Sequence, residues 1–387
     1  MNQNLSVTNC SFLSLQVLHW AHNNADHVIP LYCFDPRHYT QTHHYNFPKT
    51  GPFRLKFLLE SVKDLRETLK KKGSNLVVRK GKPEDVIRDF ILQIGSVASV
   101  AFHEEATKEE LDVEKALTEV CSEHRVAVQT FWGSTLYHHH DLPFKHISRL
   151  PDVYTQFRKA VESQARVRPL LKMPAQLKPL PPETEGGHIP SLEDFGMTEP
   201  LNDPRSAFLC SGGETQALMR LQHYFWEMNL VASYKETRNG LIGLDYSTKF
   251  SPWLALGCIS PRYIYEQIRK YENERTANQS TYWVLFELAW RDYFRFVALK
   301  YGRKIFFPRG LQDKEVSWKK DPKLFDAWKD YVRLWVPELQ CIKGRDIHTP
   351  WALSNATLSQ AGVSLGSTYP LPVIMAPEWS RHINRKP

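Results

Sequence analysis

The sequence predicts two kinds of domain, an α/β domain with a doubly wound parallel sheet followed by a helical domain. Strand and helix patterns alternate from about residue 17 to residue 140, as they do in successive βαβ units. A proline-rich stretch follows, and helical patterns then continue to about residue 335. A chain of 387 residues is long enough for two or more domains with apolar cores of their own.

The elements of the predicted α/β domain can be followed along the chain. An apolar run at 28–34 predicts a buried strand. An amphipathic helix is predicted at 53–72, with its apolar residues on one face: Phe57, Leu58, Val62, Leu65 and Leu69. The pattern continues with a strand at 76–78, a helix at 83–94, a strand at 97–102, a helix at 108–124 and a strand at 126–131.

Eight prolines between about residues 165 and 205 predict an extended linker between the domains. They are Pro169, Pro174, Pro179, Pro181, Pro182, Pro190, Pro200 and Pro204. We therefore divide the chain into an α/β domain at 1–145, a linker at 146–210 and a helical domain at 211–387.

The charge of the chain favours a polyanionic partner. Its formal net charge is +8 and its isoelectric point is about 9.0, which suits nucleic acid, although many proteins without such a partner share this excess.

The cysteines and the apolar segments indicate where in the cell the protein is located. The six cysteines are scattered without a C-x-x-C pair or metal-ligand spacing, which is typical of reduced thiols inside a cell. No apolar run reaches about eighteen residues, so no membrane span is expected. The N-terminus lacks the pattern of a secretory signal, and we expect a nuclear or cytoplasmic location.

The stretch at 233–262 gathers groups that suit a phosphate. Ser247, Thr248 and Ser251 supply three hydroxyls beside Lys249, and Ser251 with the proline after it predicts the start of a helix. The free N–H groups at a helix start favour a bound phosphate or pyrophosphate. Since Ser-Pro recurs at 260–261, the alternative is that both pairs merely begin two structural helices.

Three separated motifs resemble the photolyase and cryptochrome family. The first is Y-K-x-T-R-x-G followed by S-T-x-x-S-P-x-L-x-x-G-x-I-S-P-R, at 234–262. The second is YWVLFELAWRDYFRF at 282–296, and the third is YVRLWVPEL with IHTPW at 331–339 and 347–351. The wording of FHEEATKEELDVEKAL at 102–117 is most similar to the DASH cryptochromes.

The resemblance implies a cofactor and the residues that hold it. It implies that the helical domain binds flavin adenine dinucleotide (FAD) and that the α/β domain can hold an antenna, with 5,10-methenyltetrahydrofolate as a candidate. Contacts to the phosphate and ribose side of FAD would come from Tyr234, Ser247, Thr248, Lys249 and Ser251.

Three further charged residues acquire roles through the resemblance. Glu287 and Arg291 would lie between the flavin cavity and the DNA-binding mouth, the alternative being an i,i+4 ion pair worth a few tenths of a kcal/mol. Glu105 matches the place where this group of proteins contacts a folate antenna, and a solvated carboxylate is its alternative.

The resemblance also gives roles to tryptophans. Trp290 would line the substrate mouth, where a flipped base can stack on an aromatic ring, unless it is a plain core residue. Trp318 and Trp328 fall in the region from which tryptophans pass electrons to the flavin.

The chain departs from the family pattern in two places. After Lys329 the sequence passes at once to Asp330, so that the segment expected around the flavin ring is missing and the helical FAD-binding domain lacks its middle part. At the N-terminus, MNQNLSVTNCSFLSLQ replaces the family's first strand.

Two functions therefore stand beside each other. The first is a DASH-type cryptochrome, expected to be a monomeric flavoprotein that repairs cyclobutane pyrimidine dimers in single-stranded DNA under blue light, with a photoreceptor role as a further candidate. The second is a non-catalytic isoform that binds nucleic acid without flavin. Loss of several charge-assisted hydrogen bonds, each worth about 1.5–3 kcal/mol, is the reason that the second is considered.

Overall fold

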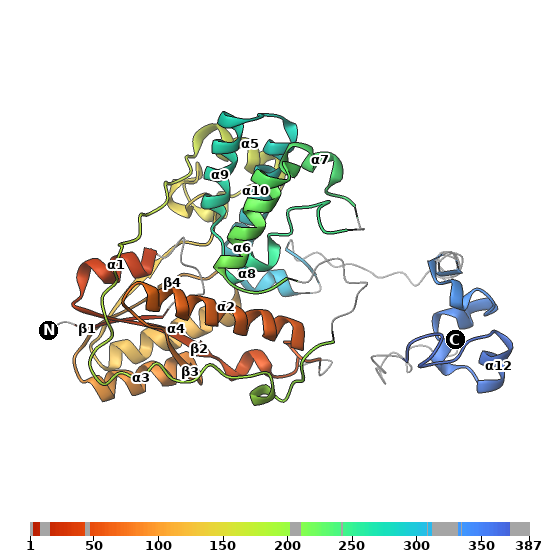
Figure 1. The fold of residues 1–387 in the computed structure, drawn as a ribbon, viewed down its shortest axis with the longest axis horizontal. Coiled ribbons are helices and arrows are strands. Elements are labelled where there is room, and N and C mark those ends of the chain that lie inside the picture. The colour runs from red at the N-terminus through yellow and green to blue at the C-terminus, as the bar shows by residue number, and fades with distance from the viewer. Residues whose placement is uncertain are drawn as a thin grey trace. The chain divides into compact units, whose positions relative to one another are not determined.

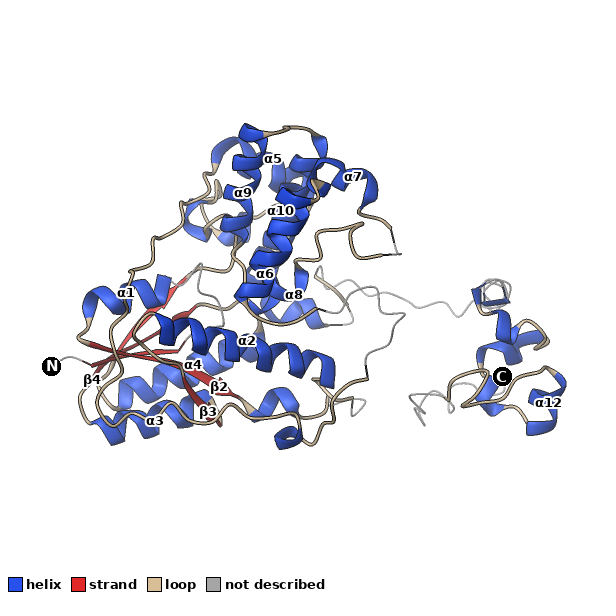
Figure 2. Ribbon diagram, in the orientation of Figure 1, coloured by secondary structure: helices blue, strands red, loops and turns tan. Residues whose placement is uncertain are grey.

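The computed structural model describes residues 3–7, 16–42, 47–201, 210–240, 243–307, 309–311, 332–333 and 335–371. The chain divides into two compact units, Met1–Gln312 and Asp313–Pro387. The first unit contains a parallel sheet with its helices and a bundle of further helices (Figures 1 and 2).

The sheet has five strands in the order β3-β2-β1-β4-β5, and every neighbouring pair is parallel. The strands are β1(Gln3–Val7), β2(His27–Phe34), β3(Val77–Lys80), β4(Val97–His103) and β5(Ala127–Phe131). The order reverses beside β1, as in a doubly wound sheet. The fold class expected for the α/β domain is thereby confirmed.

The central strand comes from the segment that departs from the family pattern. Residues Gln3–Val7 pair with β2 on one side and with β4 on the other. Backbone hydrogen bonds require no particular side chain, so a different sequence can occupy the central position of the sheet. The replaced N-terminus therefore still contributes a strand.

Helices cover both faces of the sheet, as the two apolar clusters show. They are α1(Gln16–Asn24), α2(Pro52–Lys71), α3(Pro83–Ile94) and α4(Lys108–Glu123). One cluster joins Val28 and Val78 of the strands to α1 and α2, and the other joins Ile29 and Val77 to α3 and α4. Successive strand residues point to opposite faces, so the adjacent buried residues Val28 and Ile29 of β2 supply one cluster each.

The helical part of the first unit is built around one long helix. Its helices are α5(Tyr154–Gln164), α6(Glu214–Leu221), α7(Tyr234–Thr237), α8(Ser251–Leu256), α9(Pro261–Glu274) and α10(Gln279–Tyr301). Asn278 caps α10 by accepting from the N–H groups of Ser280 and Thr281, and its own N–H donates to the Thr281 hydroxyl. This capping box fixes the first turn of the helix.

One helix lies within the segment that we expected to be linker. Tyr154, Phe157 and Val161 of α5 recur on one helix face and are buried in the helical core. The Tyr154 hydroxyl also donates to the Phe286 carbonyl of α10 at 2.7 Å. Residues 154–164 therefore belong to the helical core, because their apolar periodicity is satisfied there.

The second unit has a small core of its own. Its described elements are η8(Pro337–Leu339), η9(Gly344–His348), η10(Pro350–Ala352) and α12(Asn355–Gln360). Leu339, Ile342, Ile347, Leu358 and Val363 are buried together. Among the described residues of both units, no helix is long and apolar enough to cross a membrane.

Candidate flavin site and domain junction

A loop between α7 and α8 carries the predicted phosphate contacts, and one arginine holds this loop in place. Arg220 of α6 donates to the carbonyls of Leu244, Ser247 and Thr248 at 2.8–3.2 Å and to the Asp245 carboxylate at 2.7 Å. The arginine is buried and its bonds to the backbone fix the path of the loop. The sequence analysis did not predict this role. The signal was that Arg220 shares the buried face of α6 with Ala217 and Leu221, where a charged side chain needs a partner.

Tyr234, which the resemblance assigns to the phosphate and ribose side of FAD, lies against this loop. The ring is buried at the start of α7, and burial raises the pKa of its hydroxyl, as does the negative charge of Glu287. Hydrogen bonding with the side chains of Ser247 and Thr248 works in the opposite direction and lowers this pKa. The structure thus brings Tyr234, both hydroxyls and Glu287 into one cluster.

Glu287 and Arg291 of α10 bind other partners and not each other. Glu287 pairs with Arg238 at 2.7 Å, at the C-terminal end of α7. Arg291 donates to the carbonyls of Ser134 at 2.5 Å and Leu254 at 3.2 Å. The helix ion pair that we considered as their alternative is therefore wrong, because each side chain turns toward a different neighbouring segment.

Lys249 and Ser251 complete the loop. Lys249 adopts a left-handed backbone with φ of 60°, and its ammonium lies 3.7 Å from the centre of the Tyr246 ring and bonds to the Tyr246 hydroxyl. Ser251 is exposed and is the first residue of α8. The ammonium is thus held by a neighbouring side chain at the edge of the loop.

The two predicted Ser-Pro helix starts differ. Ser260 caps α9, and its hydroxyl accepts from the Arg262 N–H at 3.2 Å, which confirms that prediction. Ser251 does not cap α8: the cap position is Phe250, whose φ of −72° and ψ of −13° are already helical. The helix therefore begins one residue earlier than predicted, and the Ser251 hydroxyl makes no capping bond.

Trp290 takes part in an aromatic stack that reaches the surface. Its ring lies parallel to that of Tyr154, 3.6 Å away, and stacks on Phe294 at 5.3 Å. Phe294 is 63% exposed, so the outer end of the stack is open to solvent. Trp318 and Trp328 lie outside the described residues.

Glu105 joins the α/β domain to α10. Its carboxylate pairs with Arg295 at 2.6 Å, and the same guanidinium donates to the Glu104 carbonyl at 3.3 Å. Arg295 also lies over the ring of Trp132, 5.1 Å from its centre. The solvated carboxylate that we considered for Glu105 is therefore wrong, since the side chain pairs across the junction.

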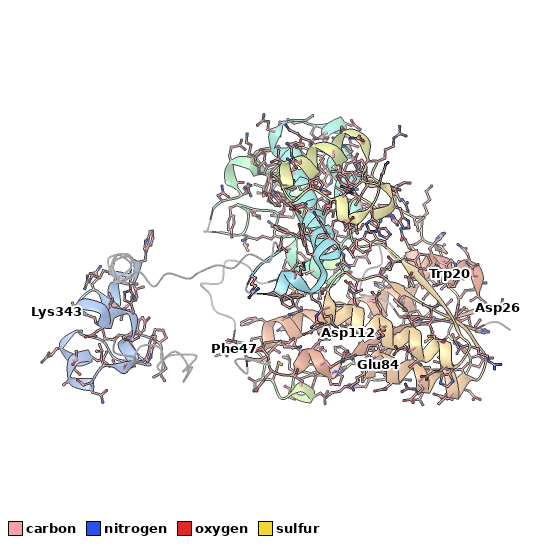
Figure 3. All side chains as sticks on the ribbon, turned by 180° about the vertical axis from the view of Figure 1, so that it is seen from behind. Trp20, Asp26, Phe47, Glu84, Asp112 and Lys343 are labelled. Carbon is pink, nitrogen blue, oxygen red and sulfur yellow. The ribbon has the colours of Figure 1, made fainter. Side chains whose placement is uncertain are left out.

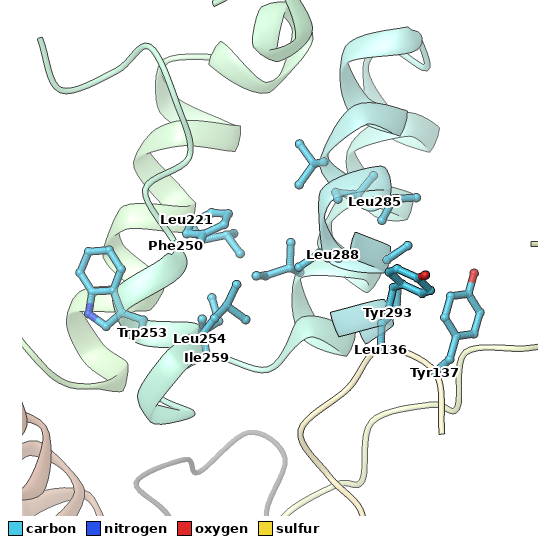
Figure 4. Close-up of a cluster of buried hydrophobic side chains, with 14 of the residues drawn as sticks. Leu136, Tyr137, Leu221, Phe250, Trp253, Leu254, Ile259, Leu285, Leu288 and Tyr293 are labelled. Atoms are coloured by element: carbon cyan, nitrogen blue, oxygen red, sulfur yellow. The ribbon is translucent and has the colours of Figure 1, made fainter. Parts of the chain in front are cut away.

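A buried carboxylate next to this contact fastens the same helix to the loop after β5. Asp292 accepts from the N–H groups of Leu136 at 3.0 Å and Tyr137 at 2.8 Å. Burial raises its pKa to about 7, although both bonds and the charge of Arg291 act against this rise. Figure 4 shows Leu136 and Tyr137 in the same apolar cluster as Leu288 and Tyr293 of α10.

Comparisons with known proteins agree with this architecture. The family of DNA photolyases matches residues 16–181, and the FAD binding domain of DNA photolyase matches residues 321–386. Cryptochrome DASH of Xenopus laevis is 59% identical over 466 aligned positions, covering 96% of this chain and 89% of the relative. Cryptochrome DASH of Danio rerio is 56% identical over 465 positions, with the same coverage.

Solved structures share the fold. A cryptochrome from Synechocystis superposes with a TM-score of 0.80 at 35% identity, covering 100% of this chain and 99% of that one. A class III photolyase from Agrobacterium tumefaciens shares the fold, with a TM-score of 0.67 at 19% identity, over 99% of this chain and 96% of that one.

The doubly wound sheet, the helical bundle and the two matching domains define a protein of the photolyase type, with an FAD-binding domain. More narrowly, the chain belongs to the cryptochrome DASH group of the DNA photolyase and cryptochrome family.

Proposed function

We propose that this chain is a DASH-type cryptochrome that repairs cyclobutane pyrimidine dimers in single-stranded DNA with FAD and blue light, with a photoreceptor role as a further candidate. The observation that carries the proposal is that Tyr234 of α7 clusters with Ser247 and Thr248. These two residues belong to the loop that Arg220 holds in place. When bound, reduced FAD supplies the electron that splits the dimer.

The donors of this loop fit the phosphate and ribose side of FAD. Among the described residues, the Lys249 ammonium has only the hydroxyl and ring of Tyr246 as partners, so it can turn to a phosphate without breaking a salt bridge to any of them. Ser251, two residues further along the chain, begins α8, whose first N–H groups have no partner within the helix. Tyr234 and Glu287 would border the cofactor at the other side of the loop.

The proposed DNA contact rests on charge and aromatic surface. The net charge of +8 favours a polyanion, and the stack of Trp290 with Tyr154 and Phe294 offers a ring face to an extruded base. A dimer in single-stranded DNA is extruded at lower cost, because fewer base pairs must break. We extend the proposal to a monomer in the nucleus or cytoplasm.

The antenna proposal rests on Glu105. A folate such as 5,10-methenyltetrahydrofolate would form hydrogen bonds with polar groups at the junction of the α/β domain and α10, Glu105 among them. Because Glu105 is paired with Arg295, the antenna must either replace this pair or bind beside it. A pterin ring that donates to the carboxylate could take the place of the guanidinium.

A specific observation also supports the second function, nucleic-acid binding without flavin. The alignment to the Xenopus relative spans 466 positions, which exceeds the 387 residues of this chain, so part of that relative has no counterpart here. We place the missing part at the junction of Lys329 and Asp330, where the family contacts the flavin ring. The match to the FAD binding domain falls in the second unit, whereas the phosphate loop is in the first.

Flavin uptake distinguishes the two functions. The purified chain is mixed with FAD, freed of excess cofactor, and examined by visible absorption beside far-ultraviolet circular dichroism. The first function predicts about one equivalent of flavin in a folded protein, and light-dependent repair of a thymine dimer in a single-stranded oligonucleotide. A folded protein without flavin would exclude it, and salt-sensitive DNA binding by that protein would support the second.

A further inference from the structure

Three consecutive histidines lie in a turn that the proposed function does not use. His138 precedes the short turn η2(His139–Asp141), and one ring nitrogen from each of His138, His139 and His140 lies within 4.8 Å of the other two. His138 is buried, His139 is partly buried and His140 is exposed. The three imidazoles therefore converge at a place that solvent can reach.

Packing holds the middle ring in position. His139 lies between two parallel rings, with Trp132 at 4.9 Å on one face and His140 at 4.0 Å on the other. His138 is tilted against both other histidines, at 4.8 and 5.1 Å. Since the rings are already ordered, a ligand that binds all three loses little conformational entropy in them.

A carboxylate lies beside the same rings. One oxygen of Glu104 accepts from the Thr130 hydroxyl at 2.8 Å, and the other oxygen is 3.9 Å from His139 Nε2. The neighbouring Glu105 instead pairs with Arg295, so the two glutamates serve different sites. Glu104 thus offers a fourth ligand, from the end of β4.

The histidines and Glu104 border a cavity of about 430 Å³. Trp20, which is labelled on α1 in Figure 3, lines another side of this cavity. Arg168 also borders it, but its guanidinium binds both oxygens of Asp141 at 2.6 and 2.8 Å, which offsets its charge. The cavity leaves room for a small cation beside the three rings.

We propose that His138, His139, His140 and Glu104 bind a divalent transition-metal ion of the zinc class. Imidazole nitrogens and a carboxylate oxygen are ligands that zinc prefers, and four of them satisfy its tetrahedral geometry. Such an ion would tie the turn after β5 to the end of β4. The ion would thereby stabilise the wall of the cavity.

Metal binding requires a small local change. Zinc lies about 2.0–2.1 Å from a histidine nitrogen, so rings whose nitrogens are up to 4.8 Å apart must rotate toward one another. The hydrogen bond that His138 Nδ1 accepts from the His140 N–H is long, at 3.2 Å, and rotation of His138 gives it up. The exposed position of His140 allows its ring to move at little cost.

Calorimetric titration of the full chain with Zn²⁺, after treatment with a chelator, tests the proposal. One equivalent of Zn²⁺ should bind, and His140→Gln should weaken binding at least about tenfold, since even outer-shell changes at zinc sites cost 10–100-fold. The double variant H139Q/H140Q should weaken it at least about 100-fold. His140 is exposed, so His140→Gln should fold normally by circular dichroism.

A matched control is needed because the chain has 16 histidines. His188 is exposed and does not border the cavity, so His188→Gln should bind Zn²⁺ like the wild type. No binding of Zn²⁺ by the wild type, or equal affinity in wild type and double variant, would overturn the proposal. FAD uptake measured on the same samples reports separately on the proposed function.

Discussion

The junction between α10 and the α/β domain differs sharply from the loop at 244–251. At the junction, Asp292 is fully buried and both of its oxygens accept backbone N–H groups. In the loop, Ser251 is exposed, and Tyr246 is the partner of Lys249 in the part of the chain that the structure describes. In this fold, the charged group at the domain junction is buried and fully hydrogen-bonded. The charged group where we propose a cofactor lies in a partly exposed loop and can bind a ligand.

Removal of the buried carboxylate should have the largest effect on stability. Asp292→Ala leaves two buried N–H groups without acceptors and should lower the free energy of unfolding by about 4 kcal/mol. Urea denaturation followed by circular dichroism measures this change. Asp89→Ala, at an exposed site on α3, is the matched control and should change stability by less than about 0.5 kcal/mol. Equal effects of the two variants would contradict the rigid junction.

Loss of the loop's anchor should affect both stability and cofactor. Arg220→Met removes the donor to three carbonyls and one carboxylate, and should cost about 3 kcal/mol of stability. Amide hydrogen exchange in residues 243–250 should also become faster, because the loop loses its fixed path. Arg88→Met, at a partly exposed side chain of α3, controls for loss of a positive charge. Unchanged exchange in the loop would show that Arg220 does not hold it.

The junction should also lose stability in acid, through His103. Burial lowers the pKa of His103 to about 4, aided by the charges of Arg295 and Arg262, and its Nε2 has no hydrogen-bond partner among the described residues. The unfolded chain binds a proton near pH 6.5, so stability is full above that pH and falls as the pH drops toward 4. We expect a loss of about 2 kcal/mol between pH 8 and pH 5.

The His103→Leu variant separates this effect from the other titrating groups. Its stability should lack this part of the pH dependence, which urea titrations at pH 8 and pH 5 would show as a smaller difference than in the wild type. An identical pH dependence in both proteins would mean that His103 has the same pKa in the folded and unfolded chains, which would contradict the prediction. Glycine at position 133 leaves room for the His103 ring, since a Cβ at Gly133 would lie 2.8 Å from His103 Nε2.

The smallest effect on stability is expected for the available ammonium of the loop. Lys249→Met should change the free energy of unfolding by less than about 0.5 kcal/mol, because the side chain makes only local contacts. If Lys249 binds a phosphate of FAD, the dissociation constant of FAD should rise about tenfold, which corresponds to the loss of one charged hydrogen bond. Fluorescence titration with FAD measures it, and Lys115→Met on α4 is the control.

The order and type of the α/β elements from β2 to β5 could be predicted because each has a strong local pattern, whereas β1 and α1 were not predicted. The predicted helix at 83–94 has the bounds that the structure shows, and the other helices and strands differ by one or a few residues. The cap at Ser251 was predicted wrongly, since the sequence does not reveal that Phe250 already has helical backbone angles. Helix α5 was missed because the linker was predicted to begin at residue 146, although Tyr154, Phe157 and Val161 form an apolar helix face after that point.

The family, the doubly wound domain and the loop of hydroxyls near Tyr234 can be inferred from the amino-acid sequence, because motifs and apolar periodicity are local properties of the chain. The partners of the charged residues can be seen only in the folded chain. Glu105 meets Arg295, Glu287 meets Arg238 and Arg220 meets the loop across separations that no local pattern encodes. Burial makes such partners necessary, and which residues are brought together depends on how the helices pack.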